Sequence, residues 1–415
     1  MNLFDLFFKY IEKTEPPLIY YRWSLVVAIG AFIGRRALID MGRFRVFPNH
    51  YVMLIGNPGT RKNTATNTVM SLLFDAGYTT FSATKTRKEK FLMDLEGERE
   101  GKKGTDAVFE NLFGSDAIET AGHDPQEVLI VAPEFNNFLP KGDLEFLSDL
   151  GDLWDWDKPK MFYTYRLKNS KSVKIYQPTI SQLGGNTHTG FQEMFPPQSL
   201  GQGIISREIL VYSEPSGKKF TFLDSGDEKL RAEMIAMFQQ IREKITGTIV
   251  IREDARRALD IIYRSWHDLE DQRFKHYSTR RFTHLLKLCI VCGASRLSRV
   301  LEMQDILLAN SLLTYTEASM PKALGEFGKS RNAEAANKIM SVLYDTKKPL
   351  GLPSLWKVVS NDLEKVSDLS NLLVNLQNAD KIQVVKGEGF LPRQRPLDRK
   401  MLYVDYSLLK EYRDA

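Results

Sequence analysis

The feature that most constrains the fold lies between residues 50 and 76. An apolar segment over 50–55 predicts a strand, and a helical pattern over 64–76 follows it. The loop between them contains Gly56 and Gly59, which allow a close backbone path. Strand, loop and helix in this order begin the α/β cores that bind nucleotides. The segment therefore predicts an α/β fold with a candidate ligand site at the end of its first strand.

The loop has the chemistry of a phosphate-binding loop. Such a loop needs main-chain N–H groups directed inward, the positive end of a following helix, and a lysine on the terminal phosphates. Lys62 stands where this lysine is required. The sequence thus predicts an ATP site, and the alternative is a plain turn in another α/β protein. The predicted nucleotide-binding residues are Gly56, Asn57, Pro58, Gly59, Thr60, Arg61, Lys62, Asn63 and Thr64.

Two positions of this loop depart from the pattern GxxxxGK[ST]. Arg61 replaces the second glycine, which costs about 1 kcal/mol if the backbone there is strained. Asn63 replaces the hydroxyl residue that normally ligates Mg²⁺. The predicted Mg²⁺ ligands are therefore the amide oxygen of Asn63 or the hydroxyl group of Thr64.

Three further apolar segments, over 128–131, 176–183 and 208–212, predict strands separated by helices, and hence a largely parallel sheet. Glu134 follows the first of them, and an acid at this position polarises the water that attacks ATP. Pro133 stands where an aspartate that helps to hold the metal usually precedes this glutamate. An acid in a solvated loop is the alternative interpretation.

Two polar residues near the later strands complete the predicted catalytic set. Asn186 follows the segment over 176–183, where a polar side chain helps to orient the attacking water. Arg207 precedes the last strand and is predicted to reach the γ-phosphate held by a neighbouring subunit, as an arginine finger in trans. The alternatives are an asparagine in a glycine turn and a surface arginine. The predicted catalytic residues are Lys62, Glu134, Asn186 and Arg207.

Alternating residues over 162–175 predict a β-hairpin between the acid and the asparagine. The hairpin presents Lys168, Lys171 and Lys174, which suit the phosphate backbone of DNA. Exposed lysines also prevent ordinary hairpins from aggregating edge to edge. The pattern therefore predicts a DNA-binding hairpin and leaves the ordinary exposed hairpin open.

From about residue 227 to 320 the pattern is almost wholly helical. One stretch carries Arg280, Arg281 and Lys287, which are predicted to close over the nucleotide from a lid, with a solvated helix face as the alternative. Three short helices and a hairpin then predict a winged-helix pattern. The expected helices cover 337–344, 352–360 and 367–378, and the expected strands cover 382–385 and 401–404.

Together these elements predict four parts. They are an N-terminal helical segment (1–48), a P-loop ATPase core (49–217), a helical lid region (218–325) and a winged-helix-like C-terminal domain (326–415).

The bulk properties predict a cytoplasmic protein. The longest apolar run, over 25–33, is shorter than the ~20 residues that a bilayer crossing needs, so no membrane contact is expected. Cys289 and Cys292 lie in an apolar helical stretch and are expected to be buried, which fits a reducing compartment. The net charge of +5 is compatible with a nucleic-acid partner.

The segments over 31–36 and 47–59 resemble AAA+ proteins of the replicative-helicase type from phages and mobile elements. The residues around Glu134, Asn186 and Arg207 and the helix over 281–288 match these proteins in the same order. The resemblance covers roughly residues 20–300. It implies a hexameric ring that hydrolyses ATP with Mg²⁺ at subunit interfaces and moves along single-stranded or forked DNA in a bacterial host cytosol.

By the same resemblance, Lys62 binds the β- and γ-phosphates, Glu134 activates water, Asn186 senses the γ-phosphate and Arg207 is the finger. Primase or initiator activity is expected from a separate protein. Two other functions remain open. One is an origin-binding or helicase-loading protein that uses ATP only as an assembly switch, and the other is a regulatory or defence ATPase.

Overall fold

The structure, a computed structural model, describes residues 2–96, 125–139, 143–158, 161–166, 172–195, 203–222, 226–325, 331–346, 348–360, 363, 365–378, 381–385 and 387–392. The chain divides into two compact units, Met1–Phe327 and Gly328–Ala415. The division lies two residues after the predicted start of the last part. The three earlier predicted parts together form the first unit, which has one continuous hydrophobic core.

The first unit is built on a four-stranded parallel sheet with the strand order β4-β7-β3-β8. The predicted parallel sheet is therefore present. Its strands are β3 (Tyr51–Ile55), β4 (Glu127–Ala132), β7 (Thr179–Asn186) and β8 (Glu208–Tyr212). Every residue of β3 and β7 is buried, because both faces of the sheet are covered, and such strands are read in a sequence as continuous apolar runs.

The register aligns the ends of the strands. Ile55 pairs with Asn186 on one side and with Tyr212 on the other. We call this end, where the strands finish, the carboxyl edge. Tyr51 pairs with Gln182 and Glu208 near the opposite end, which we call the amino edge. All four strands run in one direction, so residues that follow them gather at the carboxyl edge.

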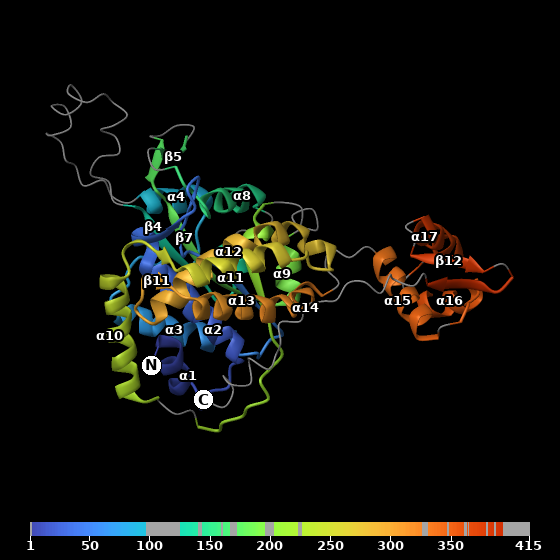
Figure 1. The fold of residues 1–415 in the computed structure, drawn as a ribbon, viewed down its shortest axis with the longest axis horizontal. Helices are drawn as coiled ribbons and strands as arrows, with labels where there is room; N and C mark the ends of the chain where they lie inside the picture. Colours follow the sequence, from blue (N-terminus) through green and yellow to red (C-terminus); the bar gives the residue numbers. More distant parts are fainter. Residues whose placement is uncertain are drawn as a thin grey trace. The chain divides into compact units, whose positions relative to one another are not determined.

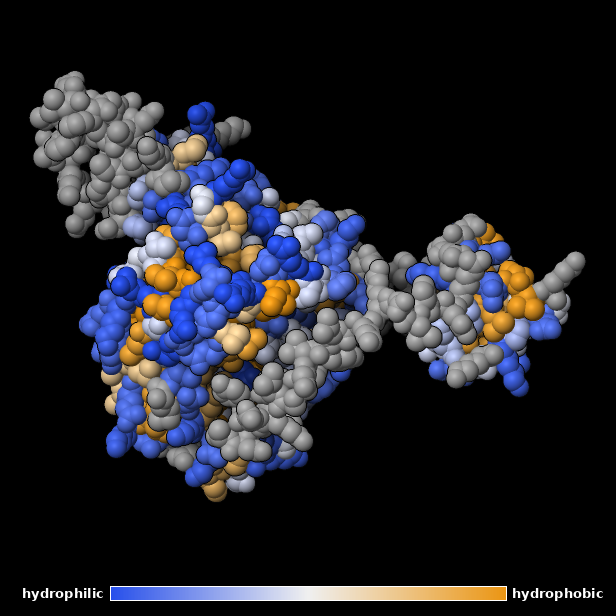
Figure 2. Space-filling model, viewed as in Figure 1, coloured by the Kyte–Doolittle hydropathy of each residue, from blue (hydrophilic) through white to orange (hydrophobic). Residues whose placement is uncertain are grey.

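Helix α2 (Leu18–Ile33) packs on the sheet and against α3 (Lys62–Asp75), and 14 of its 16 residues are buried. Among the described residues, the segment Leu18–Arg36 is the one helix long and apolar enough to cross a membrane, although 89% of its apolar window is buried inside the protein. Hydrophilic side chains cover much of the visible surface (Figure 2). These are the features of a core helix in a soluble globular protein.

The predicted helical region is present and packs against α2 and the start of the chain. Helices α11, α12 and α13 lie side by side, and α10 packs on α1 (Leu3–Tyr10) (Figure 1). Cys289 and Cys292 are buried in α12, as expected. The helices are α10 (Glu228–Lys244), α11 (Glu253–Ser265), α12 (Lys275–Ser295), α13 (Met303–Glu317) and α14 (Met320–Leu324).

Short elements complete the first unit. The segment over 37–46, expected to be helical, forms two strands, because β1 pairs with the distant strand β9. The strands are β1 (Ala37–Asp40), β2 (Arg45–Val46), β5 (Phe162–Tyr165), β6 (Val173–Tyr176), β9 (Gly247–Thr248), β10 (Val250–Ile251) and β11 (Val300–Leu301). The helices are α4 (Lys88–Glu96), α7 (Phe135–Phe138), α8 (Leu144–Leu153), α9 (His188–Met194) and the 3-10 turns η1 (Gly34–Arg36), η3 (Ile205–Arg207) and η4 (Gln272–Phe274).

The second unit contains three helices and a hairpin around its own core, which includes Ile339, Leu355 and Leu373. The elements are α15 (Arg331–Thr346), α16 (Leu352–Val359), α17 (Val366–Asn378), β12 (Ile382–Val385) and β13 (Gly389–Pro392). The second strand was expected at 401–404, which lies outside the described residues. The partner of β12 is instead β13, because Val385 pairs directly with Gly389 across a short turn.

Candidate functional site

The predicted phosphate loop connects β3 to α3 at the carboxyl edge. Gly59 has φ +84° and Arg61 has φ +62°, so both adopt the left-handed conformation. Helix α3 begins at Lys62, two residues earlier than predicted. Arg61 thus occupies a conformation that glycine adopts freely and that costs other residues about 1 kcal/mol or more. The strain anticipated at this position is present.

Gly56 is required by close packing at the start of the loop. A Cβ atom at this position would lie 2.4 Å from the Tyr20 hydroxyl oxygen. That hydroxyl group lies 2.8 Å from the Ile55 carbonyl oxygen and 3.0 Å from the Ser213 carbonyl oxygen. Tyr20, at the start of α2, therefore fixes the loop against the ends of both β3 and β8.

The Lys62 ammonium group turns back into the loop. It donates to the carbonyl oxygens of Gly56 at 2.8 Å and Asn57 at 3.2 Å, and to the Thr60 hydroxyl at 3.2 Å. Partial burial lowers the pKa of Lys62, and the nearby carboxylate of Glu134 opposes this shift. The loop therefore concentrates a cation among main-chain groups at a helix N-terminus, which is a favourable environment for phosphate.

Glu134 follows β4 at the carboxyl edge and is exposed. Asn137, in the next turn, donates to its carboxylate at 3.2 Å. The strand ends approach closely here, because a Cβ atom at Gly185 would lie 2.3 Å from the Pro133 carbonyl oxygen. Gly185 thus lets β7 lie against the end of β4. This contact brings Asn186 beside the segment over 133–137, which contains Glu134 and which we call the acid loop.

Asn186 ends β7 and is 6% exposed. Its amide donates to the Asn136 side-chain oxygen at 2.8 Å, and its own oxygen accepts from the Thr187 main-chain N–H at 3.0 Å. A Cβ atom at Gly190 would lie 2.2 Å from that oxygen, so glycine is needed at this contact. The asparagine is held in one orientation between the ends of β4 and β7.

The residues present fit a magnesium nucleotide. Asn63 and Thr64 lie exposed in the first turn of α3, next to Lys62. Within the described residues no group of three or more His, Cys, Asp or Glu side chains is arranged to hold a metal. Mg²⁺ keeps several waters and binds through substrate phosphates, so one oxygen from Asn63 or Thr64 meets its need for a protein ligand.

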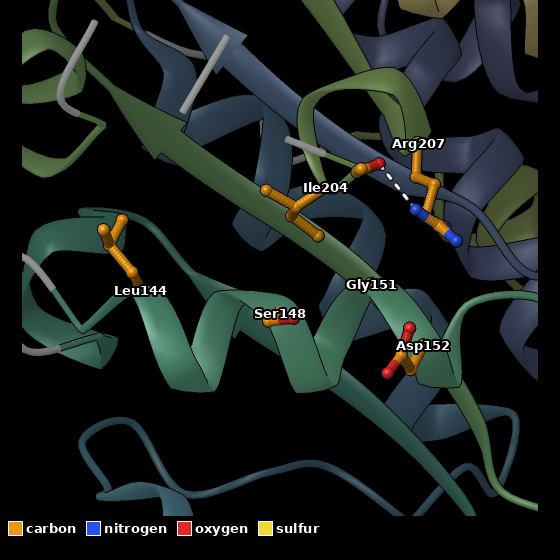
Figure 3. A pocket seen from close by; sticks show the side chains of 7 residues that line it. Leu144, Ser148, Gly151, Asp152, Ile204 and Arg207 are labelled. Atoms are coloured by element: carbon orange, nitrogen blue, oxygen red, sulfur yellow. Dashed lines mark hydrogen bonds between the residues drawn. The ribbon is translucent and has the colours of Figure 1, made fainter. Parts of the chain in front are cut away.

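Arg207 lies at the amino edge, directly before β8. The length of the strand, about 16 Å, separates it from the phosphate loop of the same chain. Its guanidinium group donates to the Gly203 carbonyl oxygen at 2.7 Å and lies 3.9 Å from the Asp155 carboxylate. Figure 3 shows Arg207 on one side of a pocket of about 390 Å³, with Asp152 of α8 on the other.

The predicted lid residues do not surround the phosphate loop. Arg280 donates to Asp155 at 3.1 Å, at the amino edge. Arg281 is buried and donates to Glu317 of α13 at 2.8 Å. These two charges are thus engaged by partners within the first unit, and α12 packs against α2, α13 and η3.

Lys287 is buried beside the start of β3, where it donates to the Asn49 side-chain oxygen at 2.7 Å and the Phe47 carbonyl oxygen at 3.1 Å. Burial lowers its pKa to about 7. The lid assignment of Arg280, Arg281 and Lys287 is therefore corrected: these side chains connect α12 to the amino edge and to α13.

The predicted hairpin is present as β5 and β6, which pair antiparallel from Phe162–Tyr176 to Tyr165–Val173. It directly precedes β7, so it begins at the amino edge. Lys174 is half-buried, with its ammonium group 5.9 Å from the centre of the Phe162 ring. Lys168 and Lys171 lie outside the described residues.

Several residues at the site were not predicted. Asn136 and Asn137 follow Glu134 after one residue, Phe135, and two amides so close to a candidate catalytic acid were a usable signal. Tyr20 gave no signal, because its contact with the loop joins residues 35 positions apart. Glu15, which binds Arg61 at 2.8 Å, lies 46 positions away from it in the sequence.

No model of a known protein family matches the chain, and no curated protein matches it. The roles of these residues therefore rest on their geometry and chemistry.

Proposed function

We propose that the protein is an ATPase of the AAA+ kind that moves along DNA, acting as a helicase or translocase in phage or mobile-element replication. One observation carries the proposal. The phosphate loop, Glu134 and Asn186 follow three adjacent parallel strands and meet at one edge of the sheet. Ligands of open parallel sheets bind at this edge.

The three groups have complementary tasks in phosphoryl transfer. Lys62 and the N-terminus of α3 neutralise phosphate charge, and bound Mg²⁺ supplies further neutralisation. The Glu134 carboxylate orients a water molecule and accepts its proton, while Asn137 holds the carboxylate in place. Asn186, tied to Asn136, contributes an amide beside the acid loop. Phosphoryl transfer depends mostly on this kind of positioning and charge stabilisation.

The position of Arg207 supports a ring. The amino edge is too far from the phosphate loop of the same chain for Arg207 to reach the nucleotide. A second copy that places its amino edge against this carboxyl edge supplies the missing cation. Head-to-tail contacts close into a ring where the rotation between successive copies closes, and we propose that it does so in a hexamer. DNA then contacts the β5–β6 hairpin and its lysines.

The test is ATP hydrolysis by the purified full chain with and without single-stranded DNA. We expect DNA to stimulate turnover and Lys62→Ala to lower it by about a hundredfold or more, because a charged phosphate contact is lost. Lys229→Ala, which removes an exposed lysine from the first turn of α10, serves as the control and retains turnover. Lack of DNA stimulation at every salt concentration would contradict the proposal.

A second candidate function is an origin-binding or loading protein that uses ATP as an assembly switch. The exposed face of α17 favours it, because that face carries amides and hydroxyls in place of charges. Asn and Gln side chains read adenine edges in the major groove of DNA. The residues with these groups are Ser367, Ser370, Asn371, Asn375 and Gln377, and the exposed Val374 lies among them.

The charge distribution agrees with this alternative. Residues 328–415 contain 15 lysines and arginines against 11 aspartates and glutamates, so they carry +4 of the chain's net charge of +5. Pro133 and Asn63 also point to slow turnover, because each replaces a usual metal-holding residue. A strand-displacement assay on forked DNA separates the two functions: the motor separates the strands, whereas the switch binds duplex DNA and leaves them paired.

A further inference from the structure

Arg61 of the phosphate loop forms an ion pair with a distant segment of the chain. Its Nε atom donates to the Glu15 carboxylate at 2.8 Å. The Arg61 side chain is 56% exposed, whereas that of Glu15 is 16% exposed. More than half of the arginine side chain is therefore accessible to a ligand, whereas its partner is largely covered by the protein.

Glu15 is fixed by contacts other than Arg61. Its second carboxylate oxygen accepts from the Phe220 main-chain N–H at 3.1 Å, and its carbonyl oxygen accepts from the Ser216 hydroxyl group. Pro16 and Pro17 follow it and restrict its backbone. The hydrogen bond from Phe220 and the charge of Arg61 lower the pKa of Glu15, so the carboxylate stays ionised.

The backbone of Arg61 gives a reason to look for a role of its side chain. At φ +62° a glycine is unstrained and an arginine is not. Strained residues of this kind gather at ligand sites, where the side chain compensates by its contacts. A guanidinium group binds phosphate oxygens in a bidentate manner and keeps its charge at any physiological pH.

We propose that Glu15 is a positioning residue for Arg61, and that Arg61 exchanges Glu15 for the terminal phosphate of ATP. This inference rests on the proposed ATP site. An exposed ion pair contributes little free energy, so it yields readily to a charged phosphate. ADP lacks the third phosphate and leaves Arg61 with Glu15. Arg61 therefore makes the loop prefer ATP over ADP, and its ion pair with Glu15 limits that preference.

The experiment measures binding of fluorescent ADP and of a non-hydrolysable fluorescent ATP analogue to the full chain with Mg²⁺. We expect Arg61→Ala to weaken binding of the ATP analogue about tenfold or more and binding of ADP less than twofold. Glu15→Gln keeps an oxygen for Phe220 but removes the charge. This variant should tighten binding of the ATP analogue about two- to fivefold, because Arg61 no longer has to break an ion pair with residue 15 before it binds the phosphate.

The control is Glu12→Gln, since Glu12 contacts Lys218 through its main-chain oxygen. This variant should bind both nucleotides as the wild type does. The double variant Glu15→Gln/Arg61→Ala should match Arg61→Ala, because Glu15 acts only through Arg61. An equal effect of Glu15→Gln on both nucleotides, or its persistence without Arg61, overturns the inference while the ATP site stands. Failure of the wild type to bind either nucleotide overturns both.

Discussion

The two edges of the central sheet have opposite characters. At the carboxyl edge, Asn63, Thr64 and Glu134 are exposed, and Lys62 is satisfied mainly by its own loop. At the amino edge, Lys287 and Glu208 are buried among neutral partners. One edge keeps its charged groups accessible, and the other uses polar groups to join the sheet to α12 and η3. The difference indicates that the carboxyl edge is suited to binding a ligand, whereas the amino edge holds the sheet and the neighbouring helices together.

Arg207 also lies at the amino edge, where its side chain is 11% exposed, and its removal tests the comparison most strongly. If Arg207 completes the site of a neighbouring copy, Arg207→Ala should lower DNA-stimulated ATP turnover about a thousandfold, as loss of an arginine finger does. ATP binding measured on the same variant should change little. If ATP binding is lost together with ATP turnover, Arg207 instead has a structural role at the amino edge.

Mixing variants shows whether Arg207 acts in trans. Arg207→Ala keeps Lys62, and Lys62→Ala keeps Arg207, so an equal mixture of the two should restore turnover at about a quarter of the interfaces. Each variant alone stays inactive. Turnover that does not recover after mixing contradicts action between copies.

Glu208 should set the pH dependence of stability. It is 1% exposed, receives a hydrogen bond from Gln182 at 2.6 Å, and burial raises its pKa to about 8 from 4.5. Between these values the folded chain holds a proton that the unfolded chain has released. The free energy of unfolding should therefore fall as pH rises from 4.5 to 8, by at most roughly 1.4 kcal/mol per pH unit.

The measurement is urea unfolding of the wild type and Glu208→Gln at several pH values in this window. Glutamine does not titrate, so the variant should lose this part of the slope. A slope that is unchanged in Glu208→Gln would show that other groups cause it.

Two glycines with the same φ angle give the smallest effect and the closest control. Gly59 in the phosphate loop and Gly42 in the β1–β2 turn both have φ +84°, and an added Cβ atom meets nothing within 4 Å at either. Each change to alanine should lower the free energy of unfolding by about 1 kcal/mol. Only Gly59→Ala should also weaken ATP binding, measured by titration. Equal binding by both variants would argue against the loop as the nucleotide site.

The parts of the fold that local patterns determine were predicted from the sequence. The strands over 50–55, 128–131 and 208–212 were readable because parallel strands covered on both faces need unbroken apolar runs. The segment over 37–46 was misread, because its strands depend on Gly247–Thr248, about 200 residues later. In the second unit the helices and β12 were found, but not the partner of β12.

The candidate site divides in the same way. The loop around Lys62 was found from its spacing, because consecutive residues form it. The actual contacts of Arg281 and Lys287 could not be found in this way, because their partners, Glu317 and Asn49, are distant in sequence. A charged helix face looks the same in a sequence whether it faces a nucleotide, water or a buried acid. Only the tertiary structure reveals which partner is present.

The helix α2 has a consequence for synthesis of the chain. It leaves the ribosome before most of the segments that cover it, because the Trp23 indole donates at 2.8 Å to Thr316, which is made 293 residues later. Until β7, β8 and α13 have left the ribosome, this apolar helix lacks most of the surfaces that cover it in the folded protein. We therefore expect the uncovered helix to bind ribosome-associated chaperones during synthesis, and removal of α2 would uncover the centre of the first unit.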